Sequence, residues 1–222
     1  MRILLLAITM SVFLVAGAQE NLTGAYGYKL EEPVATNTSE HAVPGGLLVL
    51  VKMEKNMYRF WLDVLSKGPD FNRTETDGTL QFINDTASFD NTFEDAAQAC
   101  ILKFKRTGNQ ITIRSEGGAA GCGSGLQANG DYPKLEKQPK LDDNWLRAQY
   151  PHAPVYKVNS AAAAFYRDQD GFQSFTPKRT LSKGNTFLAI AETETTVYTE
   201  MFLPDGTLQY GWLRKQDIKI KD

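Results

Sequence analysis

The chain has 222 residues, 42% of them hydrophobic, and it carries a net charge of −2. Such a length allows one or two domains of the usual ~100–200 residues, and the apolar content is sufficient to build their cores. The slightly acidic balance argues against a nucleic-acid partner, because proteins that bind nucleic acid normally present a basic surface.

The first residues have the pattern of a secretory signal peptide over 1–18. Arg2 gives a basic start, residues 3–17 are almost wholly apolar, and Ala16-Gly17-Ala18 ends the stretch with small residues. A membrane anchor is the alternative, but the apolar stretch is shorter than the ~20 residues that span the hydrocarbon core. We therefore expect a periplasmic or secreted protein of 222 − 18 = 204 residues, with no membrane span after signal removal.

Residues 19–135 are predicted to form an antiparallel β-barrel. Short runs rich in Val, Ile, Phe, Tyr and Thr are separated by Gly, Asn, Asp and Pro, which is typical of strands and turns. Apolar and polar side chains alternate in 100–105 and again in 110–114, and Thr107-Gly108-Asn109 between them predicts a hairpin. The expected strands span residues 22–31, 47–53, 57–64, 79–83, 87–93, 100–104, 110–114 and 126–132.

The only two cysteines, Cys100 and Cys122, are expected to form a disulfide. Export places them in an oxidising compartment, where disulfides persist. Their separation is 122 − 100 = 22 positions, and closing such a loop is worth ~3 kcal/mol in the loop-entropy model. A reactive thiol and a metal site are the competing interpretations. A metal site would need further ligands, and His41 and His152 lie in different regions, so we expect no metal and no cofactor.

Residues 136–153 are interpreted as a linker, because the sequence becomes polar and proline-bearing after Tyr132. Within it, residues 142–148 have the composition of one or two helical turns.

The last third of the chain, residues 154–222, carries several motifs in a defined order. An aromatic strand at Ala164-Phe165-Tyr166 is followed by a polar turn at 181–185, a turn at Asp205-Gly206-Thr207 and the strand Tyr210-Gly211-Trp212-Leu213. In this order the motifs resemble bacterial SH3-like domains. The resemblance implies a small SH3-like β-barrel, of a kind that commonly binds cell-wall peptides or proteins.

The N-terminal region carries a second resemblance. Its motifs are Tyr58-Arg59-Phe60-Trp61-Leu62, the strand at 99–104 and the turn Gly121-Cys122-Gly123-Ser124-Gly125. They are similar to small disulfide-bridged secreted β-barrel domains of bacterial envelope proteins, some of which are compared with lysozyme-inhibitor barrels.

Together these patterns predict a binding protein and not an enzyme. The glycine-rich turn at 121–125 lacks the residues of a phosphate-binding loop and the glycine frame of a nucleophile elbow. Aromatic side chains suit binding surfaces, since they join apolar area to a polar group. The predicted ligand-binding residues are Tyr166, Tyr198, Tyr210 and Trp212. The expected partner is a protein or a peptidoglycan-related ligand. An inhibitor of a lysozyme or other envelope-acting enzyme is the main alternative, and a hydrolase that uses a carboxylate pair is a further one.

Overall fold

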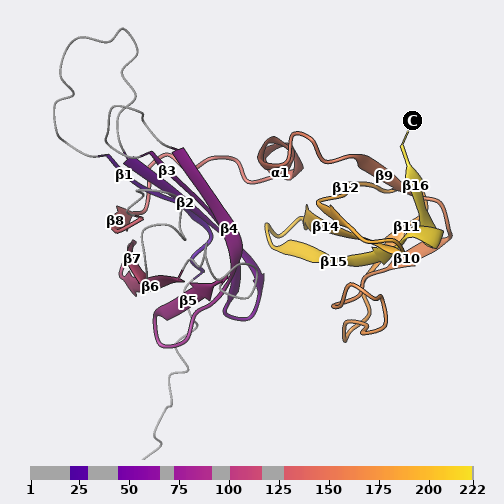
Figure 1. Ribbon diagram of the computed structural model, residues 1–222, viewed down its shortest axis with the longest axis horizontal. Helices are drawn as coiled ribbons and strands as arrows, with labels where there is room; N and C mark the ends of the chain where they lie inside the picture. The colour runs from indigo at the N-terminus through magenta and orange to yellow at the C-terminus, as the bar shows by residue number, and fades with distance from the viewer. Residues whose placement is uncertain (1–20, 30–44, 66–72, 92–100, 117–127, 222) are drawn as a thin grey trace, which may run out of the picture.

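The computed structural model describes residues 21–29, 45–65, 73–91, 101–116 and 128–221 (Figure 1). Antiparallel strands dominate these ranges, and α1 (Asp143–Gln149) is the only α-helix within them. The all-β fold class expected from the sequence is confirmed. None of the helices in these ranges has the length and apolar character needed to cross a membrane. The predicted signal peptide and both cysteines, Cys100 and Cys122, lie outside the described residues.

The first half consists of two four-stranded antiparallel sheets. The first sheet contains β1 (Gly24–Lys29), β2 (Gly45–Glu54), β3 (Met57–Leu65) and β4 (Arg73–Gln81), in that order. The second sheet contains β5 (Thr86–Asp90), β6 (Ile101–Thr107), β7 (Gln110–Glu116) and β8 (Gly130–Pro133), also in that order.

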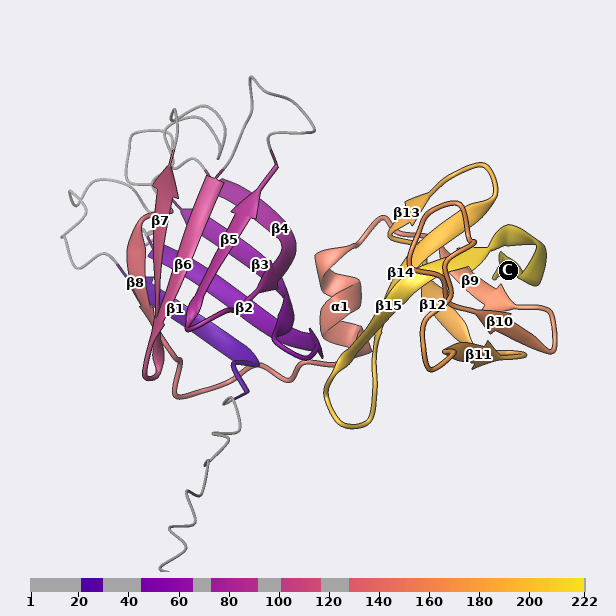
Figure 2. The same cartoon turned by 90° about the horizontal axis from the view of Figure 1, so that it is seen from below.

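The two sheets are joined at both margins (Figure 2). On one side a tight turn leads from β4 to β5, with Ile83 paired to Thr86. On the other side Tyr26 of β1 pairs with Lys134, just after β8. The space between the sheets is filled by a core of apolar side chains, so the first half is one packed unit. A closed barrel stays a prediction.

Side-chain alternation builds this core, as the sequence predicts for 100–105 and 110–114. Leu102 and Phe104 of β6 are buried, and Ile111 and Ile113 of β7 are buried beside them. The predicted hairpin is confirmed by the antiparallel pairing of β6 with β7, and Gly108 in its turn has φ +57°. A positive φ is easily adopted by glycine because it has no Cβ.

The second half contains three small antiparallel sheets. They are β10 (Ala162–Ala164) with β11 (Thr180–Ser182); β12 (Thr186–Leu188), β9 (Val155–Val158) and β16 (Ile218–Ile220); and β13 (Ala191–Glu192), β14 (Thr196–Phe202) and β15 (Leu208–Arg214). A 3-10 turn, η2 (Lys215–Asp217), leads from β15 into β16.

These sheets surround a second core, in which Val158, Phe165 and Val197 are almost fully buried. The turn expected at Asp205-Gly206-Thr207 is present: it joins β14 to β15, and Gly206 has φ +78°. Gly211, in the predicted Gly-Trp-Leu strand, lies within β15.

A third apolar cluster, which we call the junction core, joins the two halves. Its buried members come from the outer face of the first sheet, from α1 and from β15: Ala25, Val49, Val51, Met53, Trp61, Leu146 and Leu208. The segment expected as a linker takes part in it, since Leu146 of α1 is buried there. Asp142 caps α1 by accepting from the backbone N–H groups of Asn144 and Trp145, both at 3.0 Å.

Candidate functional site

Within the connection between β10 and β11, residues 167–173 form a loop that is fixed by the side chain of Asp168. Its carboxylate accepts hydrogen bonds from the backbone N–H groups of Phe172, at 3.1 Å, and Gln173, at 2.6 Å. These bonds, above all the one from Gln173, hold the pKa of Asp168 below its ordinary value. The backbone N–H of Arg167 also donates to the Gln173 carbonyl at 2.7 Å, which closes the base of the loop.

The same loop is tied to the end of β15 by Arg214. The guanidinium donates to the Gly171 carbonyl twice, from Nε at 3.1 Å and from Nη2 at 2.6 Å. Thr196 of β14 donates its hydroxyl to the Gln169 carbonyl. Arg214 also stacks over the ring of Tyr166, with Cζ 4.6 Å from the ring centre. The loop is therefore anchored to β14, to β15 and to the strand end before it.

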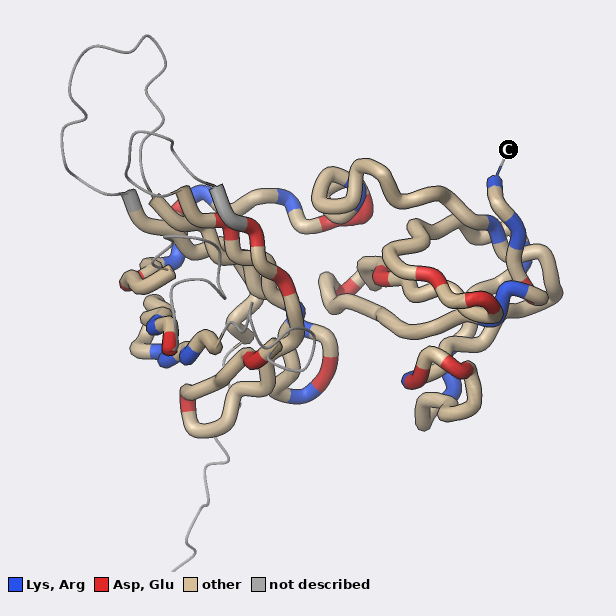
Figure 3. Tube along the Cα trace, in the orientation of Figure 1, with Lys and Arg blue, Asp and Glu red and all other residues tan. Residues whose placement is uncertain are grey.

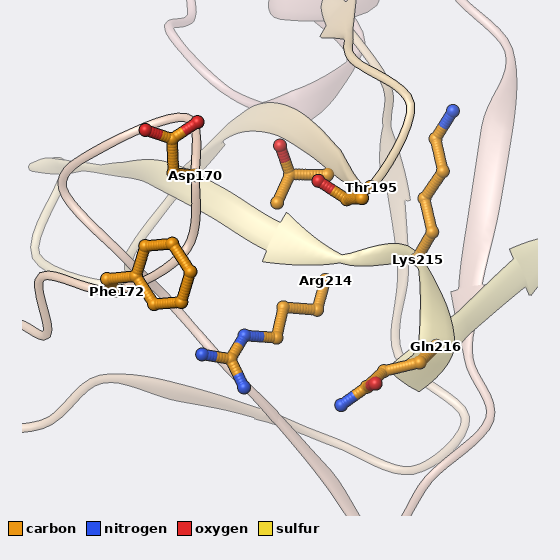
Figure 4. Close-up of a pocket in the computed structure, with 7 residues that line it drawn as sticks. Asp170, Phe172, Thr195, Arg214, Lys215 and Gln216 are labelled. Atoms are coloured by element: carbon orange, nitrogen blue, oxygen red, sulfur yellow. The ribbon is translucent and has the colours of Figure 1, made fainter.

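This anchored loop holds Phe172 in solvent with 78% of its surface exposed. Beside the ring is an open groove of about 440 Å³ (Figure 4). Figure 4 shows the Arg214 guanidinium directed toward Phe172 across the groove, while Lys215 points to the opposite side. The groove is lined by Asp170, Phe172, Thr195, Thr196, Arg214, Lys215 and Gln216.

The charged side chains that line the groove are one acidic residue, Asp170, and two basic residues, Arg214 and Lys215. Arg214 donates its hydrogen bonds to a neutral carbonyl, and it also interacts electrostatically with the Asp168 carboxylate, whose pKa it helps to lower. Lys215 is paired with Glu192 at 2.9 Å. Asp170 is the one carboxylate among the lining residues. The arrangement suits an apolar side chain placed against Phe172 with a carboxylate near Arg214.

The four residues predicted to bind a ligand are all half-buried, and none of them lines this groove. Tyr198 and Trp212 do come together, with ring centres 5.3 Å apart on one face of β14 and β15. Tyr166 lies beneath Arg214, at the edge of the groove. Tyr210 faces the first half, where its hydroxyl donates to Glu54 at 3.1 Å.

Sequence reasoning missed Phe172 and Arg214. The available signal was Asp170-Gly171 directly before an aromatic residue, since Asp-Gly marks a turn and turns lie on the surface. Arg214 has no local signal, because the bonds that define its role reach across 43 positions.

Among the residues that the structure describes, no three His, Cys, Asp or Glu side chains are grouped so that they could hold a metal ion. In comparisons with known proteins, no family model, no curated protein and no solved structure gives a significant match to this chain.

Proposed function

We propose that this is an exported binding protein whose C-terminal module, residues 154–222, is SH3-like and recognises a peptide or protein partner of the cell envelope. The observation that carries the proposal is the anchored loop that keeps Phe172 exposed beside Arg214. The partner chemistry that fits is an apolar side chain next to a carboxylate. A peptidoglycan peptide and an acidic protein segment both offer this combination.

The energetics support a binding role for this loop. Burying a Phe side chain is worth about 1.5–3 kcal/mol, and the fold forgoes most of that gain at Phe172. The bonds from Asp168, Thr196 and Arg214 fix the loop before any partner arrives. A surface ordered in advance loses less conformational entropy on association, so more of the contact energy contributes to affinity.

Sedimentation with purified peptidoglycan sacculi and titration with soluble muropeptides test the proposal directly. We expect saturable binding that weakens as salt rises, because Arg214 attracts carboxylates. Phe172→Ala should weaken binding about fivefold or more, since loss of an aromatic anchor commonly costs over 1 kcal/mol. Ile220→Ala is the matched control, as Ile220 is 58% exposed in the same half and does not line the groove. Equal binding by the two variants would count against the proposal.

A further inference from the structure

Two guanidiniums of the second half lie over one aromatic ring. The Cζ atom of Arg167 is 4.4 Å from the centre of the Phe175 ring, and the Cζ atom of Arg179 is 4.2 Å from it. The ring of Tyr210 meets that of Phe175 edge to face, with centres 5.5 Å apart. Phe175 is buried in the core of the second half, so this half positions the set by itself. We call the four residues the arginine cluster: Arg167, Phe175, Arg179 and Tyr210.

The arginine cluster holds a carboxylate that comes from the first half. Oε1 of Glu54, at the end of β2, accepts from Nη2 of Arg179 at 3.0 Å and from the Tyr210 hydroxyl at 3.1 Å. Nη2 of Arg167 lies 3.7 Å from the same oxygen. The ion pairs of both arginines therefore go to Glu54. Because guanidiniums match carboxylates in charge and in donor geometry, the cluster is built as a carboxylate site, and Glu54 occupies it.

The hairpin between β2 and β3 directs Glu54 toward this site. The strand register shifts between Lys52 and Glu54, as in a β-bulge, and bulges change the direction of a side chain. In the turn, Asn56 has φ +61°, and its carbonyl accepts from the backbone N–H of Phe82 at 2.9 Å. Figure 3 shows acidic positions on the side of the first half that faces the second half. The first half thus presents a carboxylate from a hairpin whose backbone is tied to the end of β4.

The contact that Glu54 makes is replaceable. The side chain of Glu54 is 23% exposed and that of Arg167 is 45% exposed, so a ligand can reach both. Ion pairs that water reaches contribute little to stability. The two halves are also held together by the junction core and by the Arg59–Glu200 pair, at 2.9 Å. An external carboxylate can therefore take the place of Glu54 while the halves stay docked.

We propose that the arginine cluster binds an acidic side chain of a peptide partner, and that Glu54 is an internal competitor for this site. None of the four cluster residues lines the groove beside Phe172, so the proposal stands apart from that groove. The contacts of Glu54 all use one oxygen. A partner carboxylate that engages a guanidinium with both oxygens gains the bidentate geometry that Glu54 lacks. The competition lowers the apparent affinity by the fraction of molecules in which Glu54 has left the site.

Glu54→Gln removes the competing charge and keeps the size of the side chain. The probe is the capped peptide acetyl-Gly-Glu-Gly-amide, followed by the side-chain Nε–H resonances of Arg167 and Arg179 in the ¹⁵N-labelled protein. We expect saturable shifts whose affinity is about tenfold or more higher in Glu54→Gln than in the native protein. The affinity should fall as salt rises, and acetyl-Gly-Gln-Gly-amide should give no saturable shift.

Two further variants make the test specific. Glu116→Gln makes the same charge change at an exposed ion pair of the first half, and it should leave the affinity at the cluster unchanged. Arg179 makes the shorter of the two ion pairs with Glu54. Adding Arg179→Gln to Glu54→Gln should therefore abolish the gain, as read from the Arg167 resonance. Equal affinities of the native protein and Glu54→Gln, or a gain that survives Arg179→Gln, would overturn the proposal.

A purely structural role for Glu54 predicts a different result. If Glu54 only joins the halves, Glu54→Gln should lower the unfolding temperature or raise the radius of gyration in small-angle scattering, with no gain in affinity, and this outcome also counts against the site. We expect the radius of gyration to stay at the native value. Phe172→Ala should leave the gain of Glu54→Gln unchanged, so a failure here is distinguishable from a failure of the peptidoglycan experiment.

Discussion

Arg59 on β3 and Glu200 on β14 form an ion pair across the junction, with Nε and Oε1 2.9 Å apart. The Glu200 side chain is fully buried, and its second carboxylate oxygen has no hydrogen-bond partner within the described residues. Arg59 is 12% exposed and has further partners in Asp77 and Tyr150. The two side chains therefore differ in their number of polar partners. Arg59 keeps Asp77 and Tyr150 if Glu200 is removed, whereas Glu200 would keep only the Tyr198 hydroxyl, 3.0 Å away, if Arg59 is removed.

This inequality predicts which half of the pair matters more for stability. Arg59→Met leaves a buried carboxylate without its cation, and removing one partner of a buried pair costs about 3–5 kcal/mol. Glu200→Leu should cost less, because Arg59 keeps Asp77, and the combined variant should recover part of the loss. Urea unfolding of the four proteins gives the coupling energy.

The exposed pair Lys103–Glu116, at 3.7 Å, supplies the control for this cycle. Glu116→Gln should change the free energy of unfolding by less than about 0.5 kcal/mol, as is usual for a solvent-exposed pair. An Arg59→Met variant as stable as Glu116→Gln would refute a structural role for the junction pair.

The pH dependence of stability should carry the signature of Glu200. Burial raises the pKa of Glu200, and the attraction of Arg59 offsets only part of that effect. The folded state then binds this proton more tightly than the unfolded state, whose glutamate pKa is about 4.3. The contribution is therefore fully present below that value and is lost as pH rises toward the raised pKa.

Glu200→Gln isolates this contribution from the other acids of the chain. Asp142 and Asp205 have lowered pKa values, so their linkage has the opposite sign and is common to both proteins. The free energy of unfolding of the native protein, minus that of Glu200→Gln, should fall between pH 4 and pH 7. A difference that rises over this range would show that Arg59 outweighs the burial.

The sequence predicts the parts of the fold that follow from local alternation, and it fails where a distant segment decides. Leu102 and Phe104 could be assigned to the core because they alternate with Lys103 and Lys105. Tyr198 and Tyr210 also alternate with other side chains along their strands. Alternation assigns residues to one face of a strand, but it does not tell whether that face contacts solvent or another module. Tyr210 contacts Glu54, 156 positions away, and no local pattern encodes that contact.

Gly211 explains why the Gly-Trp-Leu motif needs its glycine. Its φ is +143°, and a Cβ at this position would lie 2.8 Å from the Tyr166 carbonyl oxygen. Tyr166 and Trp212 exchange both backbone hydrogen bonds here, each at 2.9 Å, which holds the Tyr166 backbone close to Gly211. Gly211→Ala should destabilise the protein by about 1–3 kcal/mol through strain and overpacking. Thermal unfolding followed by near-ultraviolet circular dichroism measures the change.

The comparison variant for Gly211 is Gly206→Ala. Gly206 also has a positive φ, +78°, but a Cβ there would meet nothing within 4 Å. Its substitution isolates backbone strain from steric overlap, so it should be the milder of the two. If Gly206→Ala proves equally or more damaging, close packing against Tyr166 is not the reason for the glycine at 211.

Arg214→Lys tests whether order in the loop, and not charge alone, supports binding. Lysine keeps the positive charge, but it cannot reproduce the two bonds to the Gly171 carbonyl or the planar contact with Tyr166. Hydrogen exchange at the Phe172 and Gln173 amides should become at least tenfold faster, and affinity for sacculi should fall although the net charge is unchanged. Lys219→Arg, at an exposed position of the same half that does not line the groove, should alter neither quantity. Faster exchange combined with undiminished affinity would mean that the partner responds to the charge of the groove and not to the fixed position of Phe172.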